Sequence, residues 1–287
     1  MMDALIRWLS GPPLVDGICP VVDQDACEGW QCVDLTRVWA MSFVFHSIAF
    51  VVSWWISHKL SKPFRELNLE MKIYWASCVV SGLHAAITAQ GSVRWTLLNN
   101  DFNDGNYFRP VPEQDFYSAV SSAYFAYDLV LHIIFAAMGM ARFRVPEMFL
   151  HHILGVICFT AAPNYPLSWT AGMWLSTELS GPFANARFVL QYGGFRHTPL
   201  YVANGLMMVL TFLVIRLGIP ATFWYIFYLR LDEFTSLVDN WILALFVFSG
   251  LTGTVLNIMW TRLILKGFIG VAFGKGEKKE TNGKKTE

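Results

Sequence analysis

Residues 147–159 read Glu-Met-Phe-Leu-His-His-Ile-Leu-Gly-Val-Ile-Cys-Phe, an apolar run that contains two adjacent histidines, His151 and His152. Runs of similar composition recur along the chain, which indicates that most of it is embedded in a membrane. A bilayer offers an imidazole no hydrogen-bond partner, so protein or water must satisfy both rings. Polar groups held inside a membrane are functional candidates, and the histidine pair is therefore the first candidate site.

The overall composition supports a membrane-embedded fold. Of the 287 residues, 55% are hydrophobic and 15% are charged, whereas about 25% of the residues in soluble domains are charged. The formal net charge is zero, so the chain lacks the basic balance of nucleic-acid-binding proteins and no nucleic-acid partner is expected. We therefore predict an all-α, polytopic membrane protein.

The apolar stretches define the predicted helices. A transmembrane helix needs about 20 mostly apolar residues, and the chain contains about seven stretches near this length, with six or eight spans left as alternatives. The stretches are residues 38–57, 73–93, 116–141, 148–162, 167–183, 199–217 and 241–265. A further run over 219–231 is too short to span and is expected to be an interfacial or half-inserted helix.

The loops between these stretches alternate in charge. Lysine and arginine gather in residues 58–72, 142–144, 187–196 and 266–285, and the other loops contain few of them. Basic loops face the cytosol, so this pattern predicts a luminal N-terminus and a cytosolic C-terminus. The predicted organisation is a luminal tail over 1–37, a first helix and cytosolic loop over 38–71, the main helical domain over 72–273, and a disordered cytosolic tail over 274–287.

Both tails carry signals. Cys19, Cys27 and Cys32 lie in the tail assigned to the lumen, where disulfides persist, although their pairing cannot be read from the sequence. The chain ends Lys284-Lys285-Thr286-Glu287, which fits the dilysine pattern read by the coat-protein retrieval machinery. We therefore expect an integral protein of the endoplasmic reticulum, with the Golgi as the alternative.

Further polar residues accompany the histidine pair. Asp128 and His132 lie four residues apart and so share one helix face. Glu178 lies near the end of the fifth predicted span, and Asn185 and Arg187 follow it. The predicted orientation places all these groups in the cytosolic half of the membrane. The candidate catalytic residues are His151, His152 and Asp128, and the candidate substrate-binding residues are His132, Glu178, Asn185 and Arg187.

These residue types suit acid–base or acyl-transfer chemistry. An imidazole ionises near neutral pH, so either histidine could act as a base or accept an acyl group, with Asp128 orienting the ring. The alternative is that the polar groups bond to one another and to backbone and simply join the helices. No metal site is expected, because two adjacent histidines on a helix rarely both reach one ion.

Five strings in this order resemble the TLC domain family, which includes ceramide synthases. They are Ser-Ala-Tyr-Phe-Ala-Tyr-Asp-Leu at 122–129, Phe-Leu-His-His at 149–152, Thr-Glu-Leu-Ser-Gly-Pro-Phe-Ala-Asn-Ala-Arg at 177–187, Val-Ala-Asn-Gly-Leu at 202–206 and Leu-Asn-Ile-Met-Trp at 256–260. The resemblance covers roughly residues 72–273 and is greatest to the subgroup called TLC domain-containing protein 4. It implies six helices forming a barrel around a lipid-accessible cavity.

The resemblance also implies a function in lipid homeostasis. It suggests acyl transfer at the paired histidines, with acyl-CoA as co-substrate and no bound cofactor. Ceramide synthases carry a His-Asp-x-x-Asp string after the histidine pair, whereas residues 176–180 here read Ser-Thr-Glu-Leu-Ser. The alternative is therefore a non-catalytic protein that binds, senses or carries membrane lipids.

Overall fold

The computed structural model describes residues 33–272, and all of its regular structure in that range is helical. This confirms the all-α prediction. Cys19, Cys27, Cys32 and the terminal Lys284 and Lys285 lie outside the described residues, so the predictions about them stay predictions.

Twelve α-helices occupy the described range. Their bounds are α2 Leu35–Leu60, α3 Lys62–Glu66, α4 Leu69–Ser92, α5 Asn100–Asn103, α6 Pro112–Ala137, α7 Pro146–Ala161, α8 Ser168–Ser176, α9 Gly181–Tyr192, α10 Pro199–Thr211, α11 Gly218–Leu229, α12 Leu231–Leu237 and α13 Asn240–Ala272. A 3-10 turn, Thr177–Ser180, joins α8 to α9, and a π-helical segment, Phe212–Leu217, joins α10 to α11.

Local sequence signals start the long helices. The Asp34 carboxylate accepts hydrogen bonds from the backbone N–H groups of Thr36 and Arg37 at the start of α2. The Asn68 side chain caps α4 by accepting from the Met71 N–H at 2.9 Å. Helices α6, α7 and α10 begin instead with proline in the first turn, where its missing N–H removes no helical hydrogen bond.

Within residues 33–272, four helical segments are long and apolar enough to cross a membrane: Leu35–Leu60, Pro112–Ala137, Pro199–Leu229 and Asn240–Gly270. Many large apolar side chains on them are exposed, as in Val51, Val214 and Val255, which are 65%, 58% and 64% exposed. In a membrane protein such faces contact lipid. The helices therefore support a polytopic membrane fold, and the count of seven spans remains a prediction.

Two predicted boundaries are wrong. The run over 219–231 is not a separate half-inserted helix, because α11 continues α10 through the π-helical segment as one rod, Pro199–Leu229. Pro220 lies in the first turn of α11, directly after this segment. The fifth predicted span continues past residue 183 to Tyr192, because the 3-10 turn precedes Pro182, which then lies in the first turn of α9.

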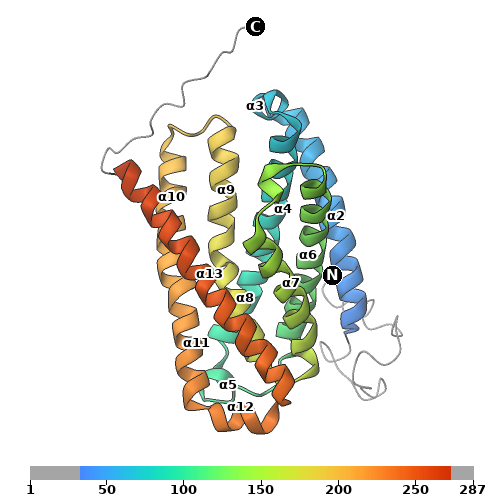
Figure 1. The fold of residues 1–287 in the computed structure, drawn as a ribbon, viewed down its shortest axis with the longest axis vertical. Coiled ribbons are helices and arrows are strands. Elements are labelled where there is room, and N and C mark those ends of the chain that lie inside the picture. Colours follow the sequence, from blue (N-terminus) through green and yellow to red (C-terminus); the bar gives the residue numbers. More distant parts are fainter. Residues whose placement is uncertain (1–32, 273–287) are drawn as a thin grey trace.

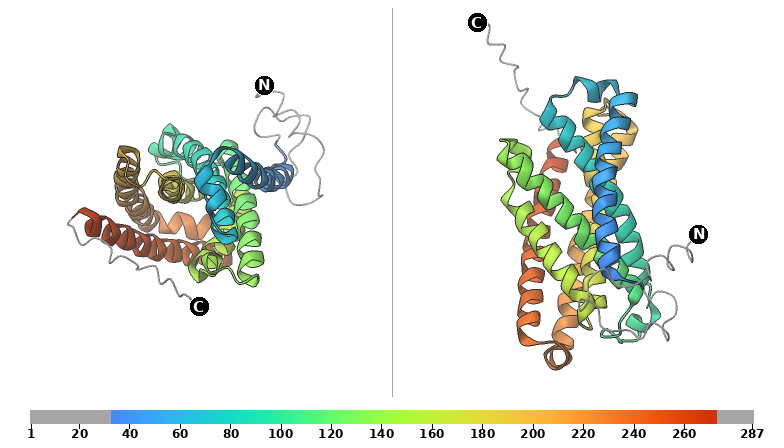
Figure 2. Two further views of the ribbon diagram at one scale, coloured as in Figure 1. Left: turned by 90° about the horizontal axis from the view of Figure 1, so that it is seen from above. Right: turned by 90° about the vertical axis from the view of Figure 1, so that its right-hand side faces the viewer.

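The helices form one elongated bundle (Figure 1). Helices α2, α4 and α6 pack against one another, α7 packs against α6, and α9 packs against α4. Helix α13 crosses the front of the bundle diagonally and contacts α7 and the π-helical segment (Figures 1 and 2). The α3 turn and the α9–α10 connection lie at one end, and α5 and α12 lie at the other. Loops predicted to be cytosolic thus share one end of the bundle.

Candidate functional site

The two adjacent histidines of α7 face different surroundings. Neighbouring helix positions differ by about 100° around the axis, so their side chains diverge. His152 is 2% exposed and points to Asp128 on α6, with 3.4 Å between Nε2 and Oδ2. His151 instead lines a cavity beside α8 and α13. The pair therefore belongs to two sites, which adjoin at α7.

The first site, here named the closed cluster, consists of Asp128, His132 and His152. The His132 Nδ1 lies 3.2 Å from Asp128 Oδ2 and 2.9 Å from the Asp128 backbone oxygen. Ser77 on α4 donates its hydroxyl to Asp128 Oδ1 at 3.3 Å. All three members are at most 5% exposed. The closed cluster therefore joins α4, α6 and α7 from the inside.

The closed cluster also has the composition of a metal site. Its three side chains each offer one ligand atom, and these atoms lie within 4.8 Å of one another. Only one member of the adjacent histidine pair takes part. Among the described residues, His152 Nδ1 finds no hydrogen-bond partner, so the second nitrogen of that ring lacks the outer contact that usually orients a metal-bound imidazole.

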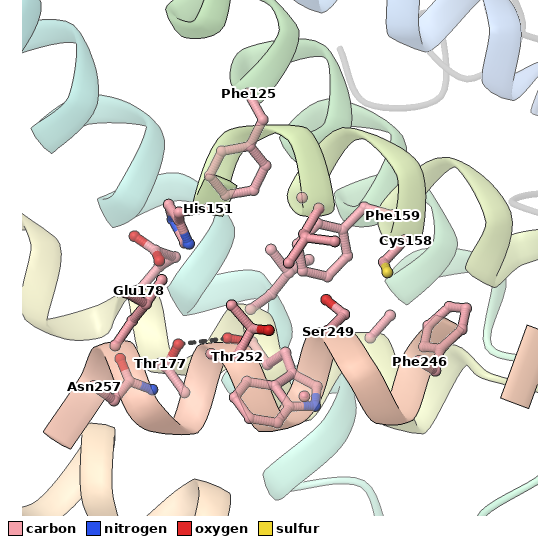
Figure 3. A pocket seen from close by; sticks show the side chains of 18 of the residues that line it. Phe125, His151, Cys158, Phe159, Thr177, Glu178, Phe246, Ser249, Thr252 and Asn257 are labelled. Carbon is pink, nitrogen blue, oxygen red and sulfur yellow. Dashed lines mark hydrogen bonds between the residues drawn. The ribbon is translucent and has the colours of Figure 1, made fainter. Parts of the chain in front are cut away.

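The second site is the cavity lined by α7, α8 and α13, here named the α7–α13 cavity. It has a volume of about 70 Å³. Figure 3 shows His151 and Glu178 at one end and Cys158 and Phe246 at the other. Its largely apolar wall consists of Phe125, Leu154, Gly155, Phe159, Trp174, Leu175, Phe246, Gly250, Gly253 and Leu256. The cavity is therefore most polar at the end with His151 and Glu178, and Ser249 and Thr252 add hydroxyls to the rest of its mostly apolar lining.

Aromatic rings fix His151 at the polar end. Its ring meets Phe125 edge to face at a centroid distance of 5.2 Å and Trp260 at 5.6 Å. Phe125 also contacts the His152 ring at 5.6 Å and so lies against both sites. The close approach of α7 to Phe125 requires Gly155, because a Cβ there would lie 2.7 Å from the Phe125 ring.

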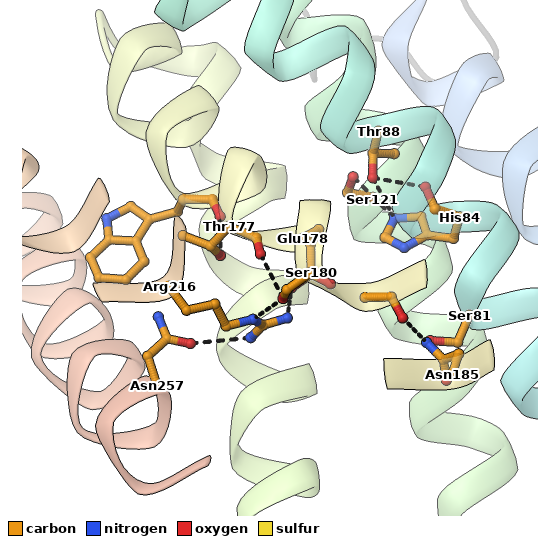
Figure 4. A network of polar contacts seen from close by, with 12 residues as sticks. Ser81, His84, Thr88, Ser121, Thr177, Glu178, Ser180, Asn185, Arg216 and Asn257 are labelled. Atoms are coloured by element: carbon orange, nitrogen blue, oxygen red, sulfur yellow. Dashed lines mark hydrogen bonds and ion pairs between the residues drawn. The ribbon is translucent and has the colours of Figure 1, made fainter. Parts of the chain in front are cut away.

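A buried arginine organises the rest of the polar end (Figure 4). Arg216, in the π-helical segment, donates to Ser180 Oγ at 2.6 Å, Asn257 Oδ1 at 3.1 Å and Glu178 Oε1 at 3.3 Å. Its guanidinium stacks on the Trp260 ring, 5.4 Å from the centroid. Arg216 is 6% exposed. The Arg216 side chain therefore connects three segments: the 3-10 turn, the π-helical segment and α13.

Arg216 and Asn257 are functional-site residues that the sequence alone did not predict. The signal for Arg216 was present, since a charged residue inside the apolar stretch 199–217 is a functional candidate by the same argument as the histidines. Asn257 lies in one of the strings that carry the family resemblance. Its side chain can be assigned a role only when the segment that contacts it, here the one that carries Arg216, is known.

Two predicted binding residues lie away from both sites. The Asn185 amide donates to Ser81 Oγ on α4 at 2.9 Å and joins two helices. The Arg187 guanidinium lies over the Tyr201 ring, 5.0 Å from its centroid, and does not line the α7–α13 cavity. His132 belongs to the closed cluster. Of the predicted binding residues, Glu178 is the one that reaches the cavity, from the middle of its helical rod.

Comparison with known proteins identifies the family. The model of the TLC domain matches residues 35–266. The chain belongs to the TLC domain family. The match includes α2, which precedes the predicted domain start at residue 72. Together with the apolar helices, this membership makes the chain an integral membrane protein.

The relatives cover most of the chain. It is 27% identical to TLC domain-containing protein 4 of Homo sapiens over 84% of this chain and 91% of that protein. It is 25% identical to TLC domain-containing protein 4-B of Xenopus laevis over 88% of this chain and 95% of the relative. Protein CLN8 of Rattus norvegicus is 26% identical over 76% of each. No solved structure matches the chain.

Proposed function

We propose that this TLC-domain protein acts in membrane lipid homeostasis by binding an amphipathic lipid in the α7–α13 cavity. The observation that carries this proposal is the composition of the cavity. His151, Glu178 and Arg216 form a polar end inside a helical bundle, and the remaining wall is mostly aromatic and aliphatic, with the hydroxyls of Ser249 and Thr252 among it. A headgroup and an acyl chain need these two environments side by side.

The size of the cavity limits how the lipid lies. A volume of about 70 Å³ encloses a headgroup fragment and excludes two acyl chains. The chains would lie along the outer faces of α7 and α13, where Ile153, Ile157 and Val255 are 42%, 43% and 64% exposed. Burial of the chains in the bilayer and of the headgroup in the protein satisfies both parts of the molecule.

A second candidate is acyl transfer from acyl-CoA to a lipid. His151 favours it, because it presents an imidazole to the cavity. The ring would remove the proton from a lipid hydroxyl or amine as that group attacks the thioester carbonyl, and CoA would leave as the thiol. Against this candidate, the carboxylate of Asp128 contacts His152 and not His151. Lipid binding without reaction is therefore the function that the geometry supports better.

Blocking the cavity tests the proposal. Ser249 lines the cavity on α13, and Ser249→Phe should fill it. Leu263→Phe is the matched control, since Leu263 lies on the same helix at 59% exposure outside the cavity. Native mass spectrometry of each purified protein should detect a copurified lipid in wild type and the control and should lose it in Ser249→Phe. Lipid retained by a folded Ser249→Phe protein would refute binding in this cavity.

A second measurement separates binding from reaction. Purified protein in nanodiscs is incubated with labelled acyl-CoA and a mixture of membrane lipids, and labelled lipid products are sought. A product that requires His151 and is lost in His151→Ala would establish the acyltransferase. Binding of lipid without any labelled product would establish the non-catalytic alternative.

We further propose that the protein resides in the endoplasmic reticulum with a luminal N-terminus and a cytosolic C-terminus, where Lys284 and Lys285 bind the retrieval coat. The sharing of one bundle end by the basic loops supports this orientation. Protease treatment of sealed microsomes should remove a C-terminal tag and spare an N-terminal one. Lys284→Ser with Lys285→Ser should move the protein forward along the secretory route, and unchanged reticular staining would refute retrieval by this tail.

A further inference from the structure

The polar end of the α7–α13 cavity carries one charge of each sign. Glu178 Oε1 and Arg216 Nη2 lie 3.3 Å apart, and their side chains are 14% and 8% exposed. The pair lies inside the helical bundle, where solvent screens charge weakly. Its charges cancel, so the polar end as a whole is electrically neutral. A ligand with a large net charge of either sign would meet one repulsive partner there.

The Arg216 guanidinium can donate further hydrogen bonds to a ligand. A guanidinium carries five N–H groups. Among the described residues, hydrogen-bond acceptors face three of its nitrogens, through Ser180, Asn257 and Glu178. Its stacking on Trp260 and Phe212 fixes the plane of the group, since the guanidinium carbon lies 5.4 Å and 5.1 Å from the two ring centroids. A planar, fixed guanidinium that lines a cavity suits an anionic oxygen such as a phosphate oxygen.

The Glu178 carboxylate can likewise accept a further hydrogen bond. Within the part of the chain that the structure describes, the hydrogen bond to Glu178 comes from Arg216 and uses Oε1. Oε2 accepts no further hydrogen bond from these residues. Glu178 lines the cavity. A carboxylate oxygen that accepts no other hydrogen bond there is suited to an ammonium group, through charge.

From this arrangement we propose that the cavity selects a zwitterionic phospholipid headgroup, with the phosphate on Arg216 and the ammonium on Glu178. The inference rests on the proposed lipid-binding function and adds the class of lipid. A zwitterion extends one ion pair into an alternating set of four charges, in which each charge has an opposite neighbour. His151 lies beside this set and can donate to a phosphate oxygen through a ring N–H.

Other lipid classes fit the same charges less well. The phosphate of phosphatidic acid would bind Arg216 but would face the Glu178 carboxylate without an intervening cation. A sphingoid base would bind Glu178 but would face the Arg216 guanidinium. Diacylglycerol carries no charge and would leave the ion pair unchanged. The expected order of affinity therefore places the zwitterion first.

The test compares four probes on the full chain in detergent by native mass spectrometry. The probes are dioleoylphosphatidylethanolamine, dioleoylphosphatidic acid, dioleoylglycerol and sphingosine. The zwitterion should bind about tenfold or more tightly than each of the others, which is the ratio expected from one charge-assisted contact. Equal or tighter binding of any other probe would overturn the headgroup inference while leaving lipid binding in place.

Variants locate the selectivity. Arg216→Gln should weaken phosphatidylethanolamine binding about tenfold or more and should weaken dioleoylglycerol binding much less. Arg187→Gln is the matched control, because Arg187 stacks on Tyr201 outside the cavity, and it should bind all four probes as wild type does. If Arg216→Gln does not fold, the wild-type ranking of the four probes decides the inference by itself.

The same experiment separates the two proposals. If none of the four probes binds, or if their binding persists in a folded Ser249→Phe protein, the proposed function fails. If the probes bind in the cavity without preference for the zwitterion, lipid binding stands and the headgroup inference fails.

Discussion

The closed cluster and the α7–α13 cavity differ in what their polar groups face. In the closed cluster, Asp128 contacts His132, His152 and Ser77, so its polar atoms are directed toward protein. In the cavity, His151 contacts the rings of Phe125 and Trp260 and is directed toward open space. The two histidines are adjacent in the chain, and the rotation of about 100° between helix positions assigns them to different sites. We infer that His152 serves packing and His151 serves ligands.

The largest expected effect concerns the closed cluster. Asp128→Ala removes the acceptor shared by two buried imidazoles and the Ser77 hydroxyl, so it should lower the free energy of unfolding by roughly 3–5 kcal/mol. Thermal unfolding in detergent measures the loss. Asp128→Asn, which keeps an acceptor oxygen, is the matched variant and should lose less.

Lipid binding sharpens this prediction. The folded fraction of Asp128→Ala should still bind lipid, since Asp128 does not line the cavity. A variant that keeps wild-type stability but loses lipid binding would show that the closed cluster is itself functional, and the distinction between the two sites would fail.

The next effect in size is that of His152→Ala. The substitution leaves Asp128 Oδ2 with one imidazole partner and opens a space between α6 and α7, where His152 is 2% exposed. We expect a loss of about 1–3 kcal/mol in the free energy of unfolding. The measured Kd for lipid should stay within about threefold of wild type in the folded protein, a change of less than 1 kcal/mol. A larger rise in Kd at unchanged stability would contradict the packing role.

Local periodicity predicted part of this arrangement. The spacing of Asp128 and His132 places them on one face of α6, and both lie in the closed cluster as a consequence. The recurring apolar runs predicted the all-α membrane fold. These features depend only on residues close in sequence, so the sequence determines them directly.

The remaining features depend on how helices meet. Asn185 and Arg187 were candidate substrate-binding residues, but on α9 they contact Ser81 and Tyr201 and do not line the cavity. Arg216 acquires its meaning from Asn257 on α13, 41 positions further along the chain. Contacts between helices that are distant in the sequence are set by tertiary packing, and the periodicity of one sequence does not predict which helices pack together.

The smallest effect on stability, and the sharpest test of the comparison, is expected for His151→Ala. No hydrogen bond joins the His151 side chain to another described residue, and its ring contacts Phe125, His152 and Trp260 at centroid distances of 5.2, 5.4 and 5.6 Å. Its removal therefore leaves no buried polar group without a partner, and the free energy of unfolding should change by less than about 1 kcal/mol. Lipid binding should fall, because the ring forms part of the polar end of the cavity.

Measured side by side, His152→Ala should lose stability and keep binding, whereas His151→Ala should keep stability and lose binding. If both variants lose stability equally and bind lipid in proportion to the folded protein that remains, the two histidines share one packing role and the division into two sites is wrong.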